Sequence, residues 1–310
     1  MFNKAISQFK NFFKRKFEES LILSAKSHFI SNRNNYSEYS NIKNSEFKVF
    51  SQNGEDGILD YLIYTLDLKN IKFIEIGVGD YTECNTRFLT HNFPFKGLVC
   101  DFNKKLKNNI KELVFTHRGE IKTYNEFINQ DDVFDILKRL NFKDNINLFS
   151  LDIDGNDYYI LKSLPDNFSD IFVAEYNQNF GPNLEVSTPY INEFNRFKYH
   201  NSGLCWGVSI KSLVKLMERK GYVFVGTNTE CCNAFFLKKE LKSKISKNYN
   251  FEINLNDCCN DFVCDARDNN GNLIQLPISK RLEAIKELEV IDLSKENRED
   301  KVKISTLLFR

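Results

Sequence analysis

The sequence lacks an excess of charge of either sign. Its 310 residues include 43 Lys and Arg against 42 Asp and Glu, so the formal net charge is +1. Proteins that bind nucleic acid usually carry a strongly basic face, because contacts with phosphates supply much of their affinity. We therefore expect no DNA or RNA partner for this chain.

Long apolar runs are also missing. A helix that crosses a bilayer needs about 20 consecutive apolar residues, and no stretch of this sequence reaches that length. We expect a cytoplasmic protein that is soluble or at most attached to a membrane surface. At 310 residues the chain is long enough to bury a substantial core.

Paired C-x-x-C spacings, which are typical of zinc sites, are absent as well. The eight cysteines include two adjacent pairs, Cys231 with Cys232 and Cys258 with Cys259, and adjacent cysteines do not each close an ordinary disulfide. We expect no signal peptide, so reduced cytoplasmic thiols are the better interpretation. For the cysteine-rich segment DCCNDFVCD at 257–265 we predict no zinc.

An amphipathic basic helix is predicted at the start of the chain, in MFNKAISQFKNFFKRKFEES. Its apolar residues recur every three or four positions: Phe2, Ile6, Phe9, Phe13 and Phe17. Its basic residues are Lys4, Lys10, Lys14, Arg15 and Lys16. The stripe fits packing against the chain's own domain or a second subunit, which we favour, or peripheral contact with an anionic membrane. A homo-oligomer is therefore a candidate assembly.

The remaining chain divides into two further segments. The polar SNRNNYSEYSNIKNS is a linker that completes a first segment, residues 1–45. Short β-rich runs that alternate with helical patterns then predict one α/β domain over 46–240, with parallel strands and crossover helices. Residues 241–310 are interpreted as an extension with a turn at DNNGN, a helix near SKRLEAIKELEVI and no second sheet.

Individual elements of the α/β domain can be assigned from the pattern. Strands are expected at IKFIEI (71–76), GLVCD (97–101), 120–124, NLFSLD (147–152), IFVAE (171–175), YVFVGT and CNAFFLK (232–238). The strongest helical patterns are EDGILDYLIYTL, DDVFDILKRL and SIKSLVKLMERKG, the last of which should stop at Gly221.

The first strand runs into a glycine-containing turn, FIEIGVGDYTECNT at 73–86. In an open doubly wound sheet, ligands bind beyond the carboxyl ends of the strands, and this turn approaches them most closely. Gly77 and Gly79 would let the backbone approach a ligand, although the same glycines also suit a tight turn that binds nothing. A dinucleotide site wants G-x-G-x-x-G, and Thr82 occupies the third position, which disfavours NAD.

This turn, followed by an acid at the end of the second strand, resembles the S-adenosylmethionine-binding Rossmann-like methyltransferases. The resemblance implies that Glu75 lies near the methionine amino group, that Gly77 and Gly79 flank the methionyl part, and that Asp101 accepts hydrogen bonds from the ribose hydroxyls. Carboxylates suit a ligand that carries an ammonium and a sulfonium. The implied fold is the class I fold, a mostly parallel seven-stranded sheet with an antiparallel last strand, here with helical N- and C-terminal extensions.

A closer resemblance comes from LDIDGND at 151–157, which is similar to the signature of FkbM-type methyltransferases. Similarity to bacterial members extends to FSQNGEDGIL, ECNTRFL, VAEYNQNFGP and WGVSIKSL, and so covers residues 47–238. Gln52 and Asn85, in the first two of these segments, are predicted to bind the cofactor. Tyr81 departs from the pattern, since many methyltransferases have a third glycine there. The resemblance implies O-methylation of a hydroxyl on a sugar or sugar nucleotide, in bacterial surface-glycan (capsule or lipooligosaccharide) synthesis.

Carboxylates are expected to face the acceptor at the ends of the fourth and fifth strands. Asp152 and Glu175 end these strands, and such a pair can hold Mg²⁺, Mn²⁺ or Fe²⁺ against the acceptor oxygens, with Asn177 as a further ligand. Alternatively, Asp152 and Asp154 only cap the helix that follows. Asp152 and His200 are the predicted catalytic residues, because histidine has a suitable pKa for a base near neutrality.

Two other functions remain open on the sequence alone. A glycosyltransferase could use Asp152 and Asp154 as a D-x-D motif that holds a metal and a sugar-nucleotide diphosphate, although the E-x-G-x-G turn argues against it. The fold could also bind the cofactor without turnover, as a subunit scaffold.

Overall fold

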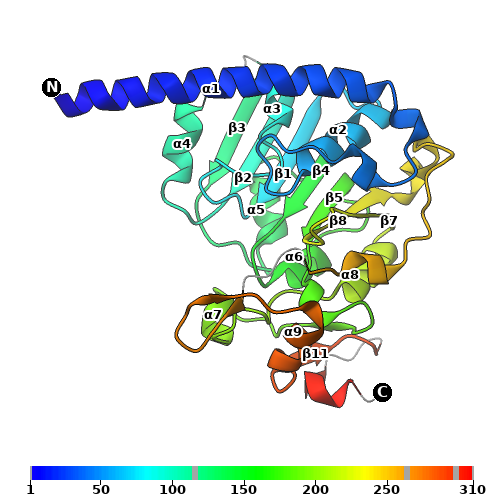
Figure 1. Cartoon of the computed structure of the whole chain (residues 1–310). Helices are drawn as coiled ribbons and strands as arrows, with labels where there is room; N and C mark the ends of the chain where they lie inside the picture. The colour runs from blue at the N-terminus through cyan, green and yellow to red at the C-terminus, as the bar shows by residue number, and fades with distance from the viewer. Residues whose placement is uncertain (1, 114–117, 262–265, 296–299, 309–310) are drawn as a thin grey trace.

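A seven-stranded sheet forms the centre of the molecule in the computed structural model, which describes residues 2–113, 118–261, 266–295 and 300–308 (Figure 1). Its strand order is β3-β2-β1-β4-β5-β8-β7. Neighbouring strands are parallel, except that β8 runs antiparallel to both β5 and β7. The predicted sheet and its antiparallel last strand are confirmed. The strands are β1 (Ile71–Ile76), β2 (Phe95–Cys100), β3 (Gly119–Tyr124), β4 (Ile146–Leu151), β5 (Ser169–Glu175), β7 (Tyr222–Thr227) and β8 (Asn233–Lys238).

Helices cover both faces of the sheet, because its parallel strands bury apolar side chains on both sides. Consecutive β1 residues show this, since Phe73 belongs to one apolar cluster and Ile74 to the other. The cluster around Ile74 includes α5 (Val133–Arg139), α6 (Asp157–Ser163) and α8 (Ile210–Arg219). The cluster around Phe73 includes α2 (Glu55–Thr65), α3 (Leu89–Asn92) and α4 (Leu106–Glu112). Gly221 follows α8 with a φ of +93°, as its predicted role as a helix stop requires.

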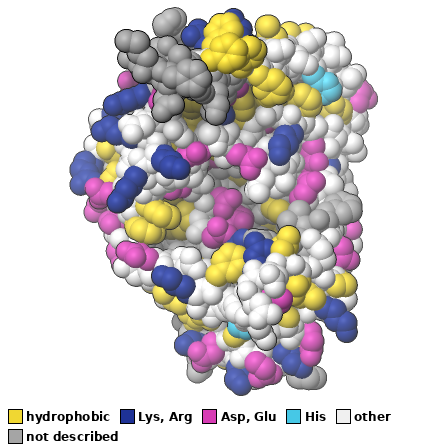
Figure 2. Space-filling model, turned by 60° about the vertical axis from the view of Figure 1, so that its left-hand side comes forward, with side chains coloured by type: hydrophobic (Ala, Val, Ile, Leu, Met, Phe, Trp, Pro, Cys, Tyr) yellow, Lys and Arg dark blue, Asp and Glu magenta, His cyan; other side chains and the backbone are white. Residues whose placement is uncertain are grey.

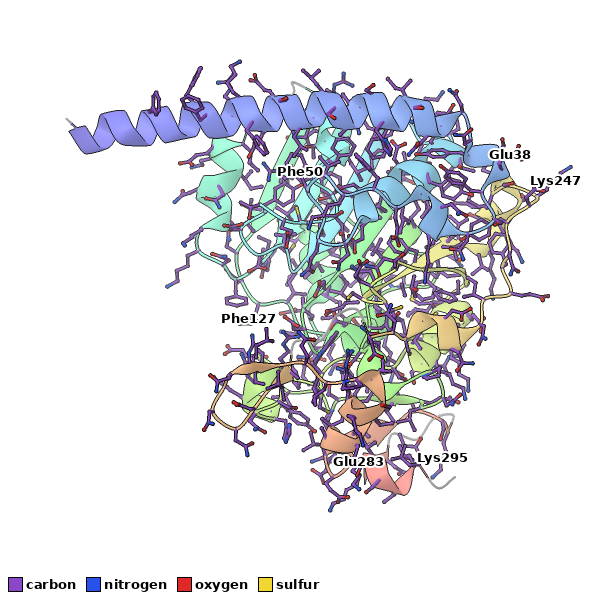
Figure 3. The ribbon with its side chains drawn as sticks, in the orientation of Figure 1. Glu38, Phe50, Phe127, Lys247, Glu283 and Lys295 are labelled. Carbon is purple, nitrogen blue, oxygen red and sulfur yellow. The ribbon has the colours of Figure 1, made fainter. Side chains whose placement is uncertain are left out.

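Helix α1 (Phe2–Arg33) is longer than the segment predicted as helical and ends just inside the predicted polar linker, which begins at Ser31. Its second half packs on the domain, where Ala25 and Phe29 form a buried cluster with Phe50 and Phe88. Phe50 lies beneath α1 in Figure 3. The linker forms two short 3-10 helices, η1 (Tyr36–Glu38) and η2 (Ile42–Ser45). Among the described helices, none combines the length and apolar character that a membrane crossing requires.

The predicted packing of the N-terminal stripe against its own domain is wrong for the side chains that the structure describes. Phe9, Phe13 and Phe17 are 65%, 55% and 71% exposed. They lie in the first half of α1, the end that extends past the sheet in Figure 1. The side chains of Phe2, Ile6, Lys4, Lys10 and Lys14 are outside the described residues.

The expectation of no second sheet after residue 240 is also wrong. Strands β11 (Glu289–Asp292) and β12 (Asp300–Lys303) pair with β6 (Val186–Ser187), which comes from the segment after β5. The predicted helix near 279–291 stops at Ile285, and the ELEVI that follows alternates between exposed and buried positions as a strand does. The turn at DNNGN is confirmed, since it joins β9 (Ala266–Arg267) to β10 (Leu273–Ile274).

A separate apolar cluster joins this C-terminal part to the segment after β5, with Phe180, Val186, Ile285 and Val290 among its members. The remaining elements are η3 (Gln178–Phe180), α7 (Arg196–Tyr199), η4 (Lys239–Lys244), η5 (Leu255–Cys258), α9 (Ile278–Ile285) and η6 (Ile304–Thr306). The C-terminal residues therefore pack on the segment that follows β5.

Candidate functional site

Two adjoining cavities lie beyond the carboxyl ends of the sheet. The first, of about 490 Å³, is bordered by the turns after β1, β2, β3 and β4, and the second, of about 230 Å³, by residues after β4, β5 and β7. Gln52, Asp152 and Asp154 line both cavities. In Figure 2 this face of the molecule is hollowed, and acidic side chains gather at the hollow. Ligands bound in the two cavities would therefore lie next to each other, and both would contact these three residues.

The two glycines after β1 serve different purposes. Gly77 has a φ of +90°, and a Cβ built on it would lie 1.5 Å from the carbonyl oxygen of Asp152. Gly77 is thus required by the close approach of two backbone segments and not by a ligand. Gly79 has a φ of +55°, and a Cβ there would meet no atom within 4 Å. Only Gly79 keeps space free in the first cavity.

Tyr81 takes the conformation that a third glycine would allow. Its φ is +68°, and its side chain is fully buried with the hydroxyl 3.0 Å from Oγ1 of Thr86. The amide of Tyr81 donates to the carbonyl oxygen of Val78, which closes the turn. The departure from the family pattern is therefore accommodated by burial of the phenol beneath the loop, away from the cavity lining.

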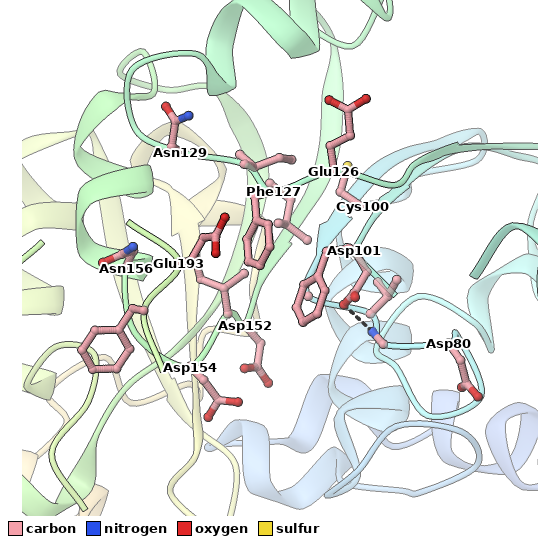
Figure 4. Close-up of a pocket in the computed structure, with 18 of the residues that line it drawn as sticks. Asp80, Cys100, Asp101, Glu126, Phe127, Asn129, Asp152, Asp154, Asn156 and Glu193 are labelled. Atoms are coloured by element: carbon pink, nitrogen blue, oxygen red, sulfur yellow. Dashed lines mark hydrogen bonds between the residues drawn. The ribbon is translucent and has the colours of Figure 1, made fainter. Parts of the chain in front are cut away.

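Asp101 lies directly after β2 and faces the first cavity. Its carboxylate accepts hydrogen bonds from the amides of Gly79 (2.7 Å) and Asn103 (2.8 Å), and the first of these bonds is drawn in Figure 4. Burial raises the pKa of Asp101. The carboxylate fixes the glycine turn and still lines the cavity, where it could accept hydrogen bonds from ligand hydroxyls.

An aromatic pair that the sequence analysis missed stands beside Asp101. The rings of Phe102 and Phe127 are stacked, with centroids 4.6 Å apart and planes inclined by 9°. Both rings line the first cavity and both are largely exposed. Figure 3 shows Phe127 on the side of the molecule where the loop after β3 runs. Phe102 could have been selected from the sequence, because it follows Asp101 at a strand end. Phe127 has no such sequence signal, since only the fold brings it to the cavity.

Glu75 and Asn85, which were predicted to bind the cofactor, lie behind the wall of the first cavity. The carboxylate of Glu75 accepts hydrogen bonds from the amides of Asn85 (2.8 Å) and Thr86 (2.9 Å), and burial raises its pKa to about 7. The side chain of Asn85 donates to Oγ of Ser150 at 3.0 Å. Neither residue is among those that line the cavity, so their visible role is to hold the loop that follows the glycine turn.

The segment SQNGEDG forms a rigid loop that presents Gln52 to both cavities. Asp56 is fully buried, and its Oδ2 accepts hydrogen bonds from the amides of residues 49–51, at 2.7 to 2.8 Å. Glu55 is also fully buried and accepts from the side-chain amides of Asn228 (2.9 Å) and Asn233 (2.8 Å). Asp56 thus holds the backbone before Gln52, and Oε2 of Glu55 accepts from the amide of Asn53 at 2.8 Å, so the two acids fix the loop that carries Gln52.

In the segment LDIDGND, too, one acid holds the loop while the other two face the cavity. Asp157 accepts hydrogen bonds from the amides of Ile153 and Gly155, both at 2.9 Å, and so holds the loop before α6. A Cβ on Gly155 would overlap the ring of Phe194, which lines the first cavity. Asp157 is therefore the residue that caps this loop. Asp152 and Asp154 point into the cavity in Figure 4.

Asp152 and Glu175 form a half-buried acid pair in the second cavity. Their carboxyl groups are hydrogen bonded to each other, which requires that one of them carry a proton. Burial raises the pKa of Asp152 to about 7. Burial and the neighbouring Asp152 raise the pKa of Glu175 well above its usual range. The pair shares one proton, and Asp152 is the member that also lines the first cavity.

The structure places the three expected metal ligands around the second cavity but gives one of them other hydrogen-bond partners. Asn177 lines the second cavity with Asp152 and Glu175, but its side-chain amide donates to the carbonyl oxygens of Leu204 and Trp206, both at 2.8 Å. Its Oδ1 accepts from the amide of Asn179. In the described ranges, no group of three or more His, Cys, Asp or Glu side chains is arranged to hold a metal. Cys264 of the segment at 257–265 is outside these ranges.

His200 is not brought to either cavity. It follows α7, and its Nδ1 lies 2.7 Å from Oγ of Ser202. Partial burial lowers its pKa. Arg196, one turn earlier in α7, does line the second cavity, with Nη1 3.3 Å from Oδ1 of Asp154. The sequence alone does not single out Arg196, because an isolated basic residue outside any motif carries no signal of its own.

Comparison with known proteins gives limited guidance. No protein-family model and no curated protein matches the chain. Among solved structures, the N-terminal domain of EvdMO1, crystallised with SAH and D-fucose, is similar at 11% identity and a TM-score of 0.37, over 57% of this chain and 78% of that one. The cyclopropane synthase MmaA2 from Mycobacterium tuberculosis matches at 10% identity and a TM-score of 0.34, over 61% of this chain and 68% of that one.

A third similar structure is the complex of the Haloferax volcanii Trm112 methyltransferase activator with a methyltransferase. The likeness has 12% identity and a TM-score of 0.32, over 54% of this chain and 70% of that one. At these scores the likenesses carry no argument about activity. The strand order and the antiparallel β8 define the fold instead, which is Rossmann-like, with a mostly parallel seven-stranded sheet.

Proposed function

We propose that this protein is an S-adenosylmethionine-dependent O-methyltransferase that methylates a hydroxyl of a sugar or sugar nucleotide, in bacterial surface-glycan synthesis. The observation that carries the proposal is the pair of adjoining cavities, one bordered by Gly79 and Asp101 and the other by the acid pair Asp152 and Glu175. The first has the size range of a small-molecule site. The sugar and the glycan pathway come from the sequence resemblance to the FkbM-type family.

The first cavity offers groups that suit an adenosyl cofactor. Asp101 supplies a carboxylate at hydrogen-bonding position for ribose hydroxyls, and the exposed rings of Phe102 and Phe127 supply a flat apolar surface for a base. Gly79 leaves room for the methionyl part. When bound, S-adenosylmethionine supplies a methyl group on a positively charged sulfur, and the acids that line both cavities complement that charge.

The second cavity offers a base for the acceptor hydroxyl. In the proposed reaction the acceptor oxygen forms a bond to the methyl carbon, the bond from that carbon to sulfur breaks, and the hydroxyl proton passes to Asp152. Glu175 keeps its own proton and donates a hydrogen bond to Asp152. Arg196 and Trp206 line the same cavity and are placed to orient the acceptor.

The proposed reaction has no step that uses a divalent metal. Asp152, Asp154 and Glu175 are the carboxylates that line the second cavity. Asp154 is paired with Arg196, and the amide of Asn177 is occupied by backbone groups. A metal that bound Asp152 and Glu175 would have to displace the proton they share. The geometry therefore favours proton removal by the acid pair itself.

Titration with S-adenosylhomocysteine is the experiment that tests the cofactor assignment. Asp101→Ala is expected to weaken its binding about tenfold or more, because charge-assisted hydrogen bonds to the ribose are lost. Asp80→Asn is the matched control. Asp80 borders the same cavity, but its carboxylate already accepts a hydrogen bond from the amide of Thr82, at 3.0 Å. This variant should bind as the wild type does.

The same titration with uridine diphosphate separates the alternatives. Binding of the nucleoside diphosphate in place of S-adenosylhomocysteine would favour the glycosyltransferase that uses Asp152 and Asp154. Normal affinity in Asp101→Ala would remove Asp101 from the cofactor site. Binding of S-adenosylhomocysteine without methyl transfer to any of a panel of sugars and sugar nucleotides would favour a non-catalytic scaffold.

A further inference from the structure

The first half of α1 presents an aromatic face to solvent, made of Phe9, Phe12, Phe13 and Phe17. All four side chains are more than half exposed. Their contacts with aromatic rings are with one another, since the ring centroids of Phe9 and Phe13 are 4.7 Å apart and those of Phe12 and Phe13 are 5.7 Å apart. Exposed apolar side chains gathered in this way mark an interaction surface more often than single exposed ones do.

The second half of α1 fixes the direction of the aromatic face. Glu18 forms an ion pair with Arg87 at 3.1 Å, and Ala25 and Phe29 are buried against the domain. At 100° per residue, Glu18, Ala25 and Phe29 lie on the side of the helix opposite Phe9. The aromatic face therefore points away from the domain, on the part of α1 that extends past the sheet (Figure 1).

Charge identifies the chemistry of the surface that this face fits. Residues 1–17 include five basic residues and no acidic one: Lys4, Lys10, Lys14, Arg15 and Lys16. Phenylalanines and basic residues on one helix are the combination by which amphipathic helices lie in the interface of an anionic bilayer. We propose that the first half of α1 docks this protein on an anionic lipid surface.

A second copy of the chain fits this face less well. A parallel pair of α1 helices would bring two basic segments together, which is unfavourable. An antiparallel pair would place each basic segment beside the second half of the other helix. There Glu18 and Glu19 already pair with Arg87 and with Arg15 and Lys16, and Lys26 adds further positive charge.

Docking through α1 would leave both cavities accessible. The second half of α1 lies near the start of β2, where the guanidinium of Arg33 is 5.8 Å from the ring centroid of Phe93. The cavities lie at the opposite, carboxyl ends of the strands. The membrane surface would then hold the protein without covering its site, and the inference does not depend on the proposed methyl transfer.

Flotation of the full chain with lipid vesicles tests the proposal. The wild type should bind vesicles of equal parts phosphatidylcholine and phosphatidylserine, and bind vesicles of phosphatidylcholine alone far more weakly. Arg15→Gln with Lys16→Gln should weaken binding about fivefold for each charge removed. High salt should have the same effect, because it screens the charges.

A triple variant, Phe9→Ser with Phe13→Ser and Phe17→Ser, should lose binding to both vesicle types, while its melting temperature stays that of the wild type because these side chains are exposed. Leu273→Ser, which removes an exposed apolar side chain from the C-terminal part, is the matched control and should bind normally. Two results would overturn the proposal: equal binding by the triple variant, or a wild-type dimer that binds no vesicles and that the triple substitution separates into monomers.

Discussion

Replacing Asp152 with asparagine is expected to lower kcat for methyl transfer by roughly 100- to 10,000-fold, the range usual for loss of a general base. Asparagine is close to aspartate in size and shape, so the cavities that Asp152 lines should keep their form. Affinity for S-adenosylhomocysteine should therefore stay near that of the wild type. The measurement is steady-state kinetics of the purified variant beside a titration with S-adenosylhomocysteine.

Glu175→Gln is the matched control for Asp152→Asn. Glutamine keeps an N–H donor for Asp152, so the hydrogen bond that Glu175 provides in its protonated form is retained. We expect kcat to remain within about tenfold of the wild type, the cost of weakening one hydrogen bond. A loss as large as that of Asp152→Asn would make Glu175 a metal ligand or the base itself, and would overturn the assignment.

The pH dependence of kcat should report the same carboxyl group. A base works in its ionised form, and burial raises the pKa of Asp152 to about 7. The ionised fraction therefore falls about tenfold for each pH unit below that pKa, and kcat should fall with it. Asp152→Asn should flatten this limb of the profile. A wild-type profile that stays flat from about two pH units below that pKa up to the pKa itself would exclude Asp152 as the base.

Chelation separates the acid pair from a metal-assisted mechanism. Exhaustive treatment with a chelator should leave wild-type turnover unchanged, because the proposed proton transfer uses only Asp152. Loss of activity that added Mn²⁺, Fe²⁺ or Mg²⁺ restores would instead show that an ion polarises the acceptor oxygen. Glu175→Gln would then be expected to resist that restoration, since it removes one of the two carboxylates.

The sheet was predictable because its signal is local. Strands such as NLFSL are mostly apolar and are buried on both faces, which distinguishes them from the helices between them. Strands β11 and β12 carry no such signal. They are short and surrounded by charge, and β11 pairs with β6 from a segment far earlier in the chain, so the pairing depends on tertiary structure.

The candidate site was predictable where a residue follows a strand directly. Gly79, Asp101 and Asp152 reach the cavities because the ends of parallel strands meet at one edge of the sheet. His200 does not follow a strand directly. It lies in a long insertion whose path no local pattern determines, so its position could not be predicted. Glu75 follows the strand pattern too, but its side chain turns to the backbone of the next loop, and hydrogen-bond partners cannot be read from spacing.

Gly79→Val is expected to abolish binding of S-adenosylhomocysteine. A Cβ on Gly79 meets no protein atom within 4 Å, so a side chain there would extend into the first cavity, where the methionyl part is proposed to lie. Valine at a φ of +55° also costs stability, because β-branched residues rarely adopt that conformation. Gly79→Asn separates the two effects, since asparagine tolerates positive φ and still places atoms in the cavity.

Gly77→Ala should behave in the opposite way to both Gly79 variants. Its Cβ would lie 1.5 Å from the carbonyl oxygen of Asp152, so β1 and β4 would have to separate at their ends. We expect a large fall in melting temperature, measured by thermal unfolding, because neither backbone can move without breaking the bond from the Asp152 amide to the Ile76 carbonyl. Gly79→Asn should unfold close to the wild-type temperature yet fail to bind S-adenosylhomocysteine. Normal binding by Gly79→Asn would place the cofactor elsewhere, because that turn would then not border the methionyl site.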